Sequence, residues 1–279
     1  MILIADSGST DTTWCLLGEK GYRKEIHTKG LNPYQRTGEQ LGYEISTALV
    51  PKLPTTGIED VYFYGAGCIY DKVGVMERAI GSLLRVTRHM EVNSDILAAA
   101  RGLYLDQPGI ACILGTGSNS CFYDGEKITQ NVSSLGFILG DEGSGAAIGK
   151  NFISDLLKNQ LGDELKEKFL KEYNTDVGTI MDCVYRRPNP NRYLASFSPF
   201  ILKNIGNEYV RTMVRENLKA FFRRNVMQYD YRNYPVSFIG SVAYYYKDIL
   251  LEAAEEVGIS RIGKIERAPI EGLIRFHMQ

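Results

Sequence analysis

The feature that most constrains this chain is a pattern that occurs twice: a short apolar run, a turn rich in glycine and hydroxyl residues, and a second apolar run. The first copy spans Ile2–Leu17 with its turn at residues 6–10, and the second spans Ile110–Tyr123 with its turn at residues 115–118. Each copy predicts a strand, a tight turn and another strand. We therefore predict two related halves, each opening with such a hairpin.

Helical periodicity fills the spaces between the predicted strands. A capping box at Thr37–Gln40 begins one helix, apolar residues across 73–84 mark another, and residues 146 to about 227 are mostly helical with a break at Pro188–Pro190. Strands interleaved with helices predict an α/β fold.

Three local predictions complete this outline. Asp124-Gly125 reads as a two-residue hairpin turn leading into a strand at 126–130. Val61–Tyr64 and Val236–Ile239 are further strands that end in glycine turns. The stripe of Tyr209, Met213, Leu218, Phe221 and Phe222 is predicted to lie in the core.

Length and charge narrow the class of protein. The 279 residues predict about two domains, and 32 basic against 33 acidic residues give a net charge of −1. This balance argues against nucleic-acid and membrane-surface partners, which favour a basic face, but it allows a small anionic ligand. Apolar runs too short for a bilayer and a start without a basic region predict a cytoplasmic protein.

The cysteines and histidines predict neither a disulfide framework nor a metal site. The five cysteines are an odd number without a CxxC pair, and the three histidines show no ligand spacing. Cys112 and Cys121, on either side of the second glycine turn, are predicted to be buried thiols, with a reactive role as the alternative because they are close together.

The first turn, Asp6–Thr12, has the chemistry of a phosphate cradle. Small residues let backbone N–H groups approach an anion, and hydroxyls add donors. It is not a Walker A loop, because no Gly-Lys-Ser/Thr follows. Asp6, at the end of its strand, is placed to hold Mg²⁺ through water. The structural alternative is an ordinary tight hairpin.

The second turn, Gly115–Asn119, has the same composition at the same place in its half. One such turn alone is weak evidence. Two of them, each after a predicted buried strand, favour a pair of loops that hold one polyphosphate.

Other candidate residues each have a structural alternative. Residues 139–145 place Asp141 and Glu142 in a glycine-rich turn, which also suits an acidic helix start. Asp95 reads first as part of a helix N-cap, and Asn32 reads first as part of a turn. Gly240-Ser241 is a strand-to-helix turn that is uninformative alone.

Taken together, these pieces resemble a known superfamily. Asp6–Thr12, Gly115–Asn119 and Gly240–Val242 look like the two phosphate loops and the adenosine loop of the actin, sugar-kinase and heat-shock-chaperone ATPases. Residues 113–119 followed by Leu139–Ser144 resemble the N-acetylglucosamine kinase branch. That branch also includes ATPase subunits of benzoyl-CoA reductase and activators of 2-hydroxyacyl-CoA dehydratases. The resemblance runs from Ile2 to about Phe276.

The resemblance implies a fold of two ribonuclease-H-like, actin-like ATPase domains flanking an ATP and sugar cleft. The N-terminal domain would comprise residues 1–107 plus 268–279, with the sugar site and the first phosphate loop. The C-terminal domain would comprise 108–267, with the second phosphate loop and the adenosine loop.

The resemblance also implies roles for individual residues. Asp95 would be the general base, and Asp6 would hold Mg²⁺ through water. The ATP contacts would come from Ser9, Thr10, Thr12, Gly115, Thr116, Gly117, Ser118, Gly240 and Ser241. The sugar contacts would come from Asn32, Asp95, Thr116, Leu135, Gly136 and Asp141.

Two positions depart from the family pattern. Relatives often carry Lys or Arg where Asp11 stands, so a cationic contact to the phosphates is missing. N-acetylglucosamine kinases place Trp where Leu135 stands, which bears on the identity of the sugar.

The sequence is therefore expected to encode an ATP- and Mg²⁺-dependent kinase that phosphorylates N-acetylglucosamine at its 6-hydroxyl. A kinase for glucosamine or another hexose, an ATPase that activates a partner reductase or dehydratase, and a non-catalytic sugar sensor are the alternatives. The expected partner is a small sugar, with no nucleic acid and no membrane, and a homodimer is the candidate assembly.

Overall fold

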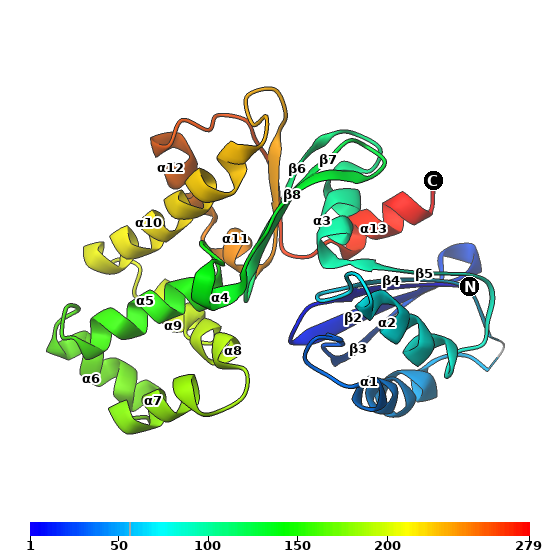
Figure 1. The fold of residues 1–279 in the computed structure, drawn as a ribbon, viewed down its shortest axis with the longest axis horizontal. Coiled ribbons are helices and arrows are strands. Elements are labelled where there is room, and N and C mark those ends of the chain that lie inside the picture. Colours follow the sequence, from blue (N-terminus) through cyan, green and yellow to red (C-terminus); the bar gives the residue numbers. More distant parts are fainter. Residues whose placement is uncertain (56) are drawn as a thin grey trace. The chain divides into compact units, whose positions relative to one another are not determined.

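A computed structural model describes residues 1–55 and 57–279 of the chain, which divides into two compact units (Figure 1). Unit 1 comprises Met1–Asp106 together with Pro269–Gln279, and unit 2 comprises Gln107–Ala268. Each unit is built on one five-stranded sheet. No helix among the described residues has the length and hydropathy needed to cross a bilayer.

The sheet of unit 1 has the order β3-β2-β1-β4-β5. Its strands are β1 (Ile2–Ser7), β2 (Asp11–Leu17), β3 (Arg23–Lys29), β4 (Ile58–Gly65) and β5 (Val86–Ser94). The first three strands are antiparallel neighbours, whereas β4 and β5 run parallel to β1. The first predicted turn is thus the hairpin between β1 and β2.

Helices cover both faces of this sheet because its central strands alternate apolar side chains between them. On one face, α1 (Gly38–Glu44), a π-helical turn (Ile45–Leu49) and α2 (Lys72–Gly81) pack on the cluster around Leu3, Trp14 and Phe63. On the other face, α3 (Asp95–Tyr104) and α13 (Ile270–His277) pack around Ile4 and Tyr64. Short 3₁₀ turns lie at Glu19–Gly21 and Val50–Lys52.

The two helices α3 and α13 approach closely at a pair of glycines. A Cβ atom at Gly272 would lie 2.0 Å from the carbonyl oxygen of Gly102. Only glycine fits such a contact, so the C-terminal helix is fixed against unit 1 by backbone packing.

Unit 2 repeats the strand order of unit 1. Its sheet is β10-β9-β6-β7-β8, formed by β6 (Gly109–Leu114), β7 (Ser118–Tyr123), β8 (Ile128–Val132), β9 (Val236–Ile239) and β10 (Ile262–Glu266). Again the first three strands are antiparallel, and the last two run parallel to the first. The prediction of two related α/β halves is confirmed.

The helices of unit 2 lie mostly between β8 and β9, as predicted. They are α4 (Gly136–Leu139), α5 (Gly145–Leu157), α6 (Asp163–Glu172), α7 (Val177–Tyr185), α8 (Pro190–Ala195), α9 (Ser198–Lys203), α10 (Glu208–Arg224), a 3₁₀ turn (Val226–Gln228), α11 (Ser241–Tyr245) and α12 (Lys247–Glu256). Their core contains a cluster of phenylalanines, among them Phe152, Phe169 and Phe200, with ring centroids 5.2–5.8 Å apart.

Three local predictions need correction. The helix predicted across residues 73–84 ends at Gly81, a residue of weak helix propensity. The second hairpin has a longer loop than two residues, because the Asp124 carboxylate accepts the N–H groups of Glu126 and Lys127 and strand β8 starts only at Ile128. Tyr209, predicted to be core, is 46% exposed at the start of α10.

A polar cluster joins α13 to the sheet of unit 1. The Tyr64 hydroxyl lies 2.8 Å from His277 Nε2, and Arg101 donates to both Tyr64 and Glu91 at 2.7 and 3.1 Å. Burial, aided by the positive charge of Arg101, lowers the pKa of His277 to about 4. His277 is therefore neutral in the folded protein at pH values where the unfolded chain, with an imidazole pKa of about 6.5, gains a proton.

This difference predicts a pH-dependent contribution of His277 to stability. The contribution is fully present above pH 6.5 and is lost as the pH falls toward 4, because the unfolded state then binds the extra proton. Between pH 7 and pH 5, wild type should lose about 1 kcal/mol more unfolding free energy than His277→Asn, after allowance for partial solvent exposure. Urea unfolding of both proteins at the two pH values measures this, and equal losses would contradict it.

Candidate active site

The first turn is held by backbone contacts that only small residues permit. The Gly8 N–H donates to the Asp11 carbonyl at 2.9 Å, and the Gly30 N–H donates to the Thr10 carbonyl at 2.7 Å. A Cβ at Gly30 would lie 2.5 Å from the Gly8 oxygen. The backbone of the turn therefore packs directly against Gly30, and the Thr10 side chain is exposed.

Thr12 faces the interior rather than a ligand. Its hydroxyl lies 2.7 Å from Ser7 Oγ and donates to the Lys29 carbonyl at 3.1 Å, and the Leu31 N–H donates to Ser7 Oγ at 3.0 Å. Both Ser7 and Thr12 are fully buried as opposed residues of the hairpin. The strand alternation thus gives the Thr12 side chain a structural role, and its assignment as an ATP contact stays a prediction.

Asn32 connects the first turn with the segment that follows β4. Its amide donates to Ser9 Oγ at 3.3 Å, and its Oδ1 accepts the Tyr34 N–H at 2.9 Å. Gly67, at a φ of +79°, lies so close that a Cβ there would be 2.3 Å from Asn32 Oδ1. From the sequence, Gly67 is predicted only as part of the turn at the end of a strand. A glycine at such a position also indicates that another part of the chain packs closely against its backbone, as Asn32 does here.

Two carboxyl groups lie at the same edge of the unit 1 sheet. Asp6 is near the end of β1, while Asp95 follows β5 and begins α3. Burial, and then the negative charge of Asp95, raise the pKa of Asp6 to about 7. Burial also raises the pKa of Asp95 to about 6, although its contact with the Ile96 N–H opposes the shift. The two groups therefore titrate near neutrality.

Cys68 is a neighbour of this pair that the sequence did not single out. Burial and the charge of Asp95 raise the pKa of its thiol to about 12, so it stays protonated. Its position directly after the Gly65–Gly67 turn is the sequence feature that could have placed it near the site.

The second turn rests on the start of α5. The Gly115 N–H donates to the Gly117 carbonyl at 2.9 Å, and the carbonyls of Gly115 and Thr116 accept the N–H groups of Gly145 and Ala146 at 2.8 and 3.1 Å. The turn is thereby tied to the glycine-rich segment that precedes the helix.

Asp141 belongs to that segment and reaches the second turn. It is almost completely buried at a φ of +58°, and its Oδ1 accepts the Ser118 N–H at 3.2 Å. A Cβ at Gly117 would lie 3.0 Å from the other carboxylate oxygen, Oδ2. Burial raises the pKa of Asp141 to about 6, against the opposing Ser118 N–H.

Gly240 brings the end of β9 against the second turn. Its φ is +122°, and a Cβ there would lie 2.2 Å from the Leu114 carbonyl oxygen. A cavity of about 590 Å³ opens beside this contact, and its lining includes Gly115, Thr116 and Ser241. The predicted phosphate and adenosine turns of unit 2 therefore share one cavity.

Part of this cavity wall was not found from the sequence. The rest of the lining comes from the start of α5, from α8, α9 and the link between them, and from α11 with the residue after it: Gly145, Ala195, Ser196, Ser198, Pro199, Leu202, Lys203, Val242, Tyr245 and Tyr246. They come from helices whose sequence shows only amphipathic periodicity, so no local signal marked them.

Leu135 and Gly136 lie at the start of the short helix α4. Both have positive φ angles, +58° and +73°, and the Leu135 side chain is exposed. The Asp141 N–H donates to the neighbouring Ser134 carbonyl at 3.1 Å. This contact ties the 134–136 segment to Asp141.

The repeated sheet order and the glycine turn after the first strand of each unit place the protein in the class with the actin-like ATPase fold. Two solved structures below 25% identity share this fold. One is a candidate N-acetylglucosamine kinase from Chromobacterium violaceum, with 18% identity and a TM-score of 0.74 over 99% of this chain and 98% of that one. The other is a ROK-family glucokinase from Streptomyces griseus, solved with glucose and AMPPNP, with 15% identity and a TM-score of 0.58 over 98% of this chain and 97% of that one.

A much more similar solved structure is that of a candidate N-acetylglucosamine kinase from Porphyromonas gingivalis. It is 44% identical, has a TM-score of 0.95, and the alignment covers 99% of this chain and 98% of that one. The chain belongs to the N-acetylglucosamine kinase family. No protein-family model and no curated protein matches it.

The coupling between the two carboxyl groups of unit 1 gives a direct prediction. Asp95→Asn should lower the pKa of Asp6 below 7, because removing a nearby negative charge favours ionisation. The pKa should stay above the ordinary aspartate value, since burial is the larger cause.

Carboxyl carbon chemical shifts followed by NMR against pH measure this change. Glu91→Gln is the control, since Glu91 is paired with Arg101 and is no cause of the Asp6 shift. An unchanged Asp6 titration in Asp95→Asn would show that the two carboxyl groups do not interact.

Proposed function

We propose that this protein is an ATP-dependent sugar kinase that transfers the γ-phosphoryl group to the 6-hydroxyl of N-acetylglucosamine. The observation that carries the proposal is Asp95, a desolvated carboxyl group at the start of a helix with a pKa of about 6. A general base works best when its pKa lies near the operating pH. Membership of the N-acetylglucosamine kinase family supports an amino sugar as the acceptor of the phosphoryl group.

ATP is assigned to the cavity of unit 2. Its volume of about 590 Å³ is within the usual range for a ligand of nucleotide size. Gly115, Thr116 and Ser118 would serve the phosphates through N–H and hydroxyl donors, and Gly240 with Ser241 would border the adenine. Val242 and Tyr245 provide apolar walls for a flat base.

Asp6 fits the role of the residue that holds Mg²⁺ through water. Its carboxylate is desolvated and accepts no hydrogen bond from any residue that the structure describes. The described residues contain no cluster of three or more His, Cys, Asp or Glu, but Mg²⁺ bound with phosphates needs only one or two protein carboxylates. When bound, the ion supplies charge neutralisation to the phosphates.

The proton of the sugar hydroxyl is assigned to Asp95. As the bond between the sugar oxygen and the γ-phosphorus forms and the bond from that phosphorus to ADP breaks, the carboxylate of Asp95 accepts this proton, and ADP leaves. Thr10, exposed at the first turn, offers a hydroxyl donor to the phosphates. The contribution of the chain is therefore orientation and proton acceptance rather than covalent chemistry.

Sugar hydroxyls are assigned to Asn32 and Asp141. Asn32 uses one amide hydrogen on Ser9 and its oxygen on Tyr34, which fixes the amide and leaves its second N–H for a ligand. Asp141 uses one carboxylate oxygen on the Ser118 N–H, so the other can accept from a hydroxyl. Both side chains are held in place before any ligand binds.

The alternative of an ATPase that activates a partner gains no support from the cysteines. Relatives of that kind bridge a dimer with an iron–sulfur cluster held by cysteines, and all five cysteines here are buried, free thiols.

Replacement of Asp95 tests the proposed base. Asp95→Asn should keep ATP and sugar binding but reduce kcat by about 10²–10⁴-fold, the usual effect of removing a general base. Asp163→Asn is the matched control, because Asp163 also begins a helix but is exposed. Steady-state kinetics that show equal turnover in both variants would reduce Asp95 to a helix-capping residue.

The choice of sugar is tested by ADP release against hexoses and amino sugars. N-acetylglucosamine should be the best substrate, because the apolar Leu135 side chain suits an acetyl methyl group and backbone N–H groups near Gly136 suit its carbonyl. Glucosamine, charged at pH 7, should be used poorly.

Mass spectrometry of the products separates kinase activity from ATP hydrolysis. Equal or better turnover of glucosamine would overturn the choice of sugar but keep the kinase assignment. ATP hydrolysis without any phosphorylated sugar would favour the partner-activating ATPase.

A further inference from the structure

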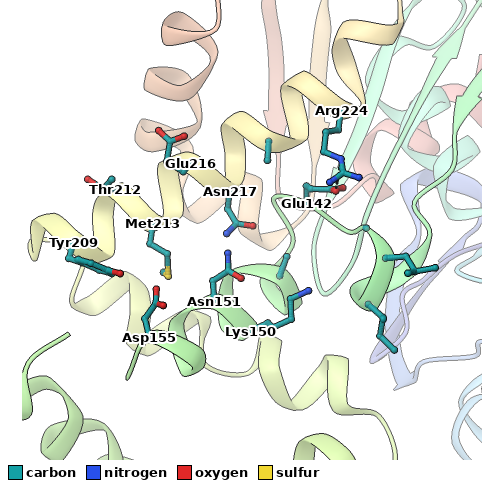
Figure 2. Close-up of a pocket in the computed structure, with 15 residues that line it drawn as sticks. Glu142, Lys150, Asn151, Asp155, Tyr209, Thr212, Met213, Glu216, Asn217 and Arg224 are labelled. Atoms are coloured by element: carbon teal, nitrogen blue, oxygen red, sulfur yellow. Dashed lines mark ion pairs between the residues drawn. The ribbon is translucent and has the colours of Figure 1, made fainter. Parts of the chain in front are cut away.

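A second cavity in unit 2 lies between helices α5 and α10 and has a volume of about 570 Å³ (Figure 2). One side is formed by α5, including Lys150, Asn151 and Asp155. The other side is the stripe of α10 from Tyr209 to Arg224, and residues 138–140 with Glu142 close one end. We call it the α5–α10 cavity; none of the roles proposed above uses it.

The charged groups around the α5–α10 cavity have partners within the protein. Arg224 pairs with Glu142 at 2.9 Å, Lys150 donates to the Phe137 carbonyl at 2.9 Å, and Lys219 pairs with Glu216 at 2.7 Å. The remaining carboxylate, Asp155, lies beside Tyr209 and contributes, after burial, to raising the pKa of that hydroxyl. A charged ligand would have to replace these contacts.

The unused hydrogen-bonding capacity belongs to neutral amides. Asn217 is only 8% exposed, yet its side chain makes no hydrogen bond with any described residue. Figure 2 shows Asn217 on α10 and Asn151 on α5 with their amides directed toward each other across the cavity. Neither amide atom of Asn217 is among the fully buried, unpartnered polar atoms of the described residues, so the amide faces the water of the cavity, which a ligand with matching groups would replace.

We propose that the α5–α10 cavity binds a neutral, polyhydroxylated ligand of about monosaccharide size. Each amide offers two N–H donors and an acceptor oxygen, and hydroxyl groups can satisfy both functions. The side chains of Met213, Ala147 and Ala220 provide apolar surface for the C–H face of such a molecule. The partnered charges disfavour an ionic ligand because binding it would expose or desolvate them.

The cavity adjoins the segment that carries Asp141. Glu142, which lines the cavity, is the next residue in the chain, and Lys150 holds the carbonyl of Phe137 in α4. A bound ligand would therefore contact the elements that position Asp141, although its binding does not depend on the function proposed above.

Binding is tested with sorbitol and methyl α-D-glucopyranoside as probes, followed by saturation-transfer NMR on the full chain. Asn151→Leu and Asn217→Leu should each weaken binding at least tenfold, whereas Asn32→Ala, which alters the proposed sugar contact instead, should not. Asn151 is exposed, so its replacement is expected to leave folding intact. Gluconate, a charged analogue, should bind at least tenfold more weakly than sorbitol.

Several outcomes would overturn the proposal. One is the absence of saturable binding to wild type, and another is binding that is lost in Asn32→Ala but kept in the α5–α10 variants. Gluconate binding as tight as that of sorbitol would contradict the inference that the cavity selects a neutral ligand. Gel filtration that shows a changed oligomeric state in Asn151→Leu, without sorbitol binding to wild type, would assign the cavity to a second copy of the chain.

Discussion

The candidate site depends on parallel strand pairing, of β1 with β4 and β4 with β5 in unit 1 and of β6 with β9 in unit 2. In unit 1, Ser7 lies opposite Gly65, and Gly65 lies opposite Ser94. This register brings Asp6, the Gly65–Gly67 turn and Asp95 to one edge of the sheet. In unit 2, Ile113 lies opposite Ile239, so the second turn meets Gly240 in the same way. Carboxyl ends of parallel strands form the usual ligand-binding edge of an α/β sheet.

Glycine residues allow the segments at the ends of these strands to pack closely against one another. At Gly30, Gly67 and Gly240, a side chain would occupy space that a backbone or amide oxygen already fills. The same small residues leave N–H groups accessible at the turns, which is what anion binding requires. Close packing and ligand access thus come from one choice of residue.

Desolvation is the second consequence of this arrangement. The carboxyl groups of Asp6 and Asp95 at the sheet edge of unit 1 and that of Asp141 in the turn before α5 lose water, and their pKa values rise to about 7, 6 and 6. The cost of burying them is compensated only partly by backbone N–H groups. Carboxyl groups retained at such a cost are characteristic of functional sites, where perturbed pKa values concentrate.

The sequence by itself determined the two hairpins, the α/β class, the helical middle and the glycine turns, because these follow from local periodicity and from residues with special backbone freedom. It also marked Asp6 as a candidate from its place at a strand end, while Asp95 and Asp141 became candidates through the family resemblance of their motifs. Only the tertiary structure decided that Thr12 faces inward, that Tyr209 is exposed, and that the largely buried Asn217 side chain has no hydrogen-bond partner among the described residues. Those outcomes depend on which surface another element covers, and the neighbours that cover each surface are distant in sequence, so no local pattern encodes them.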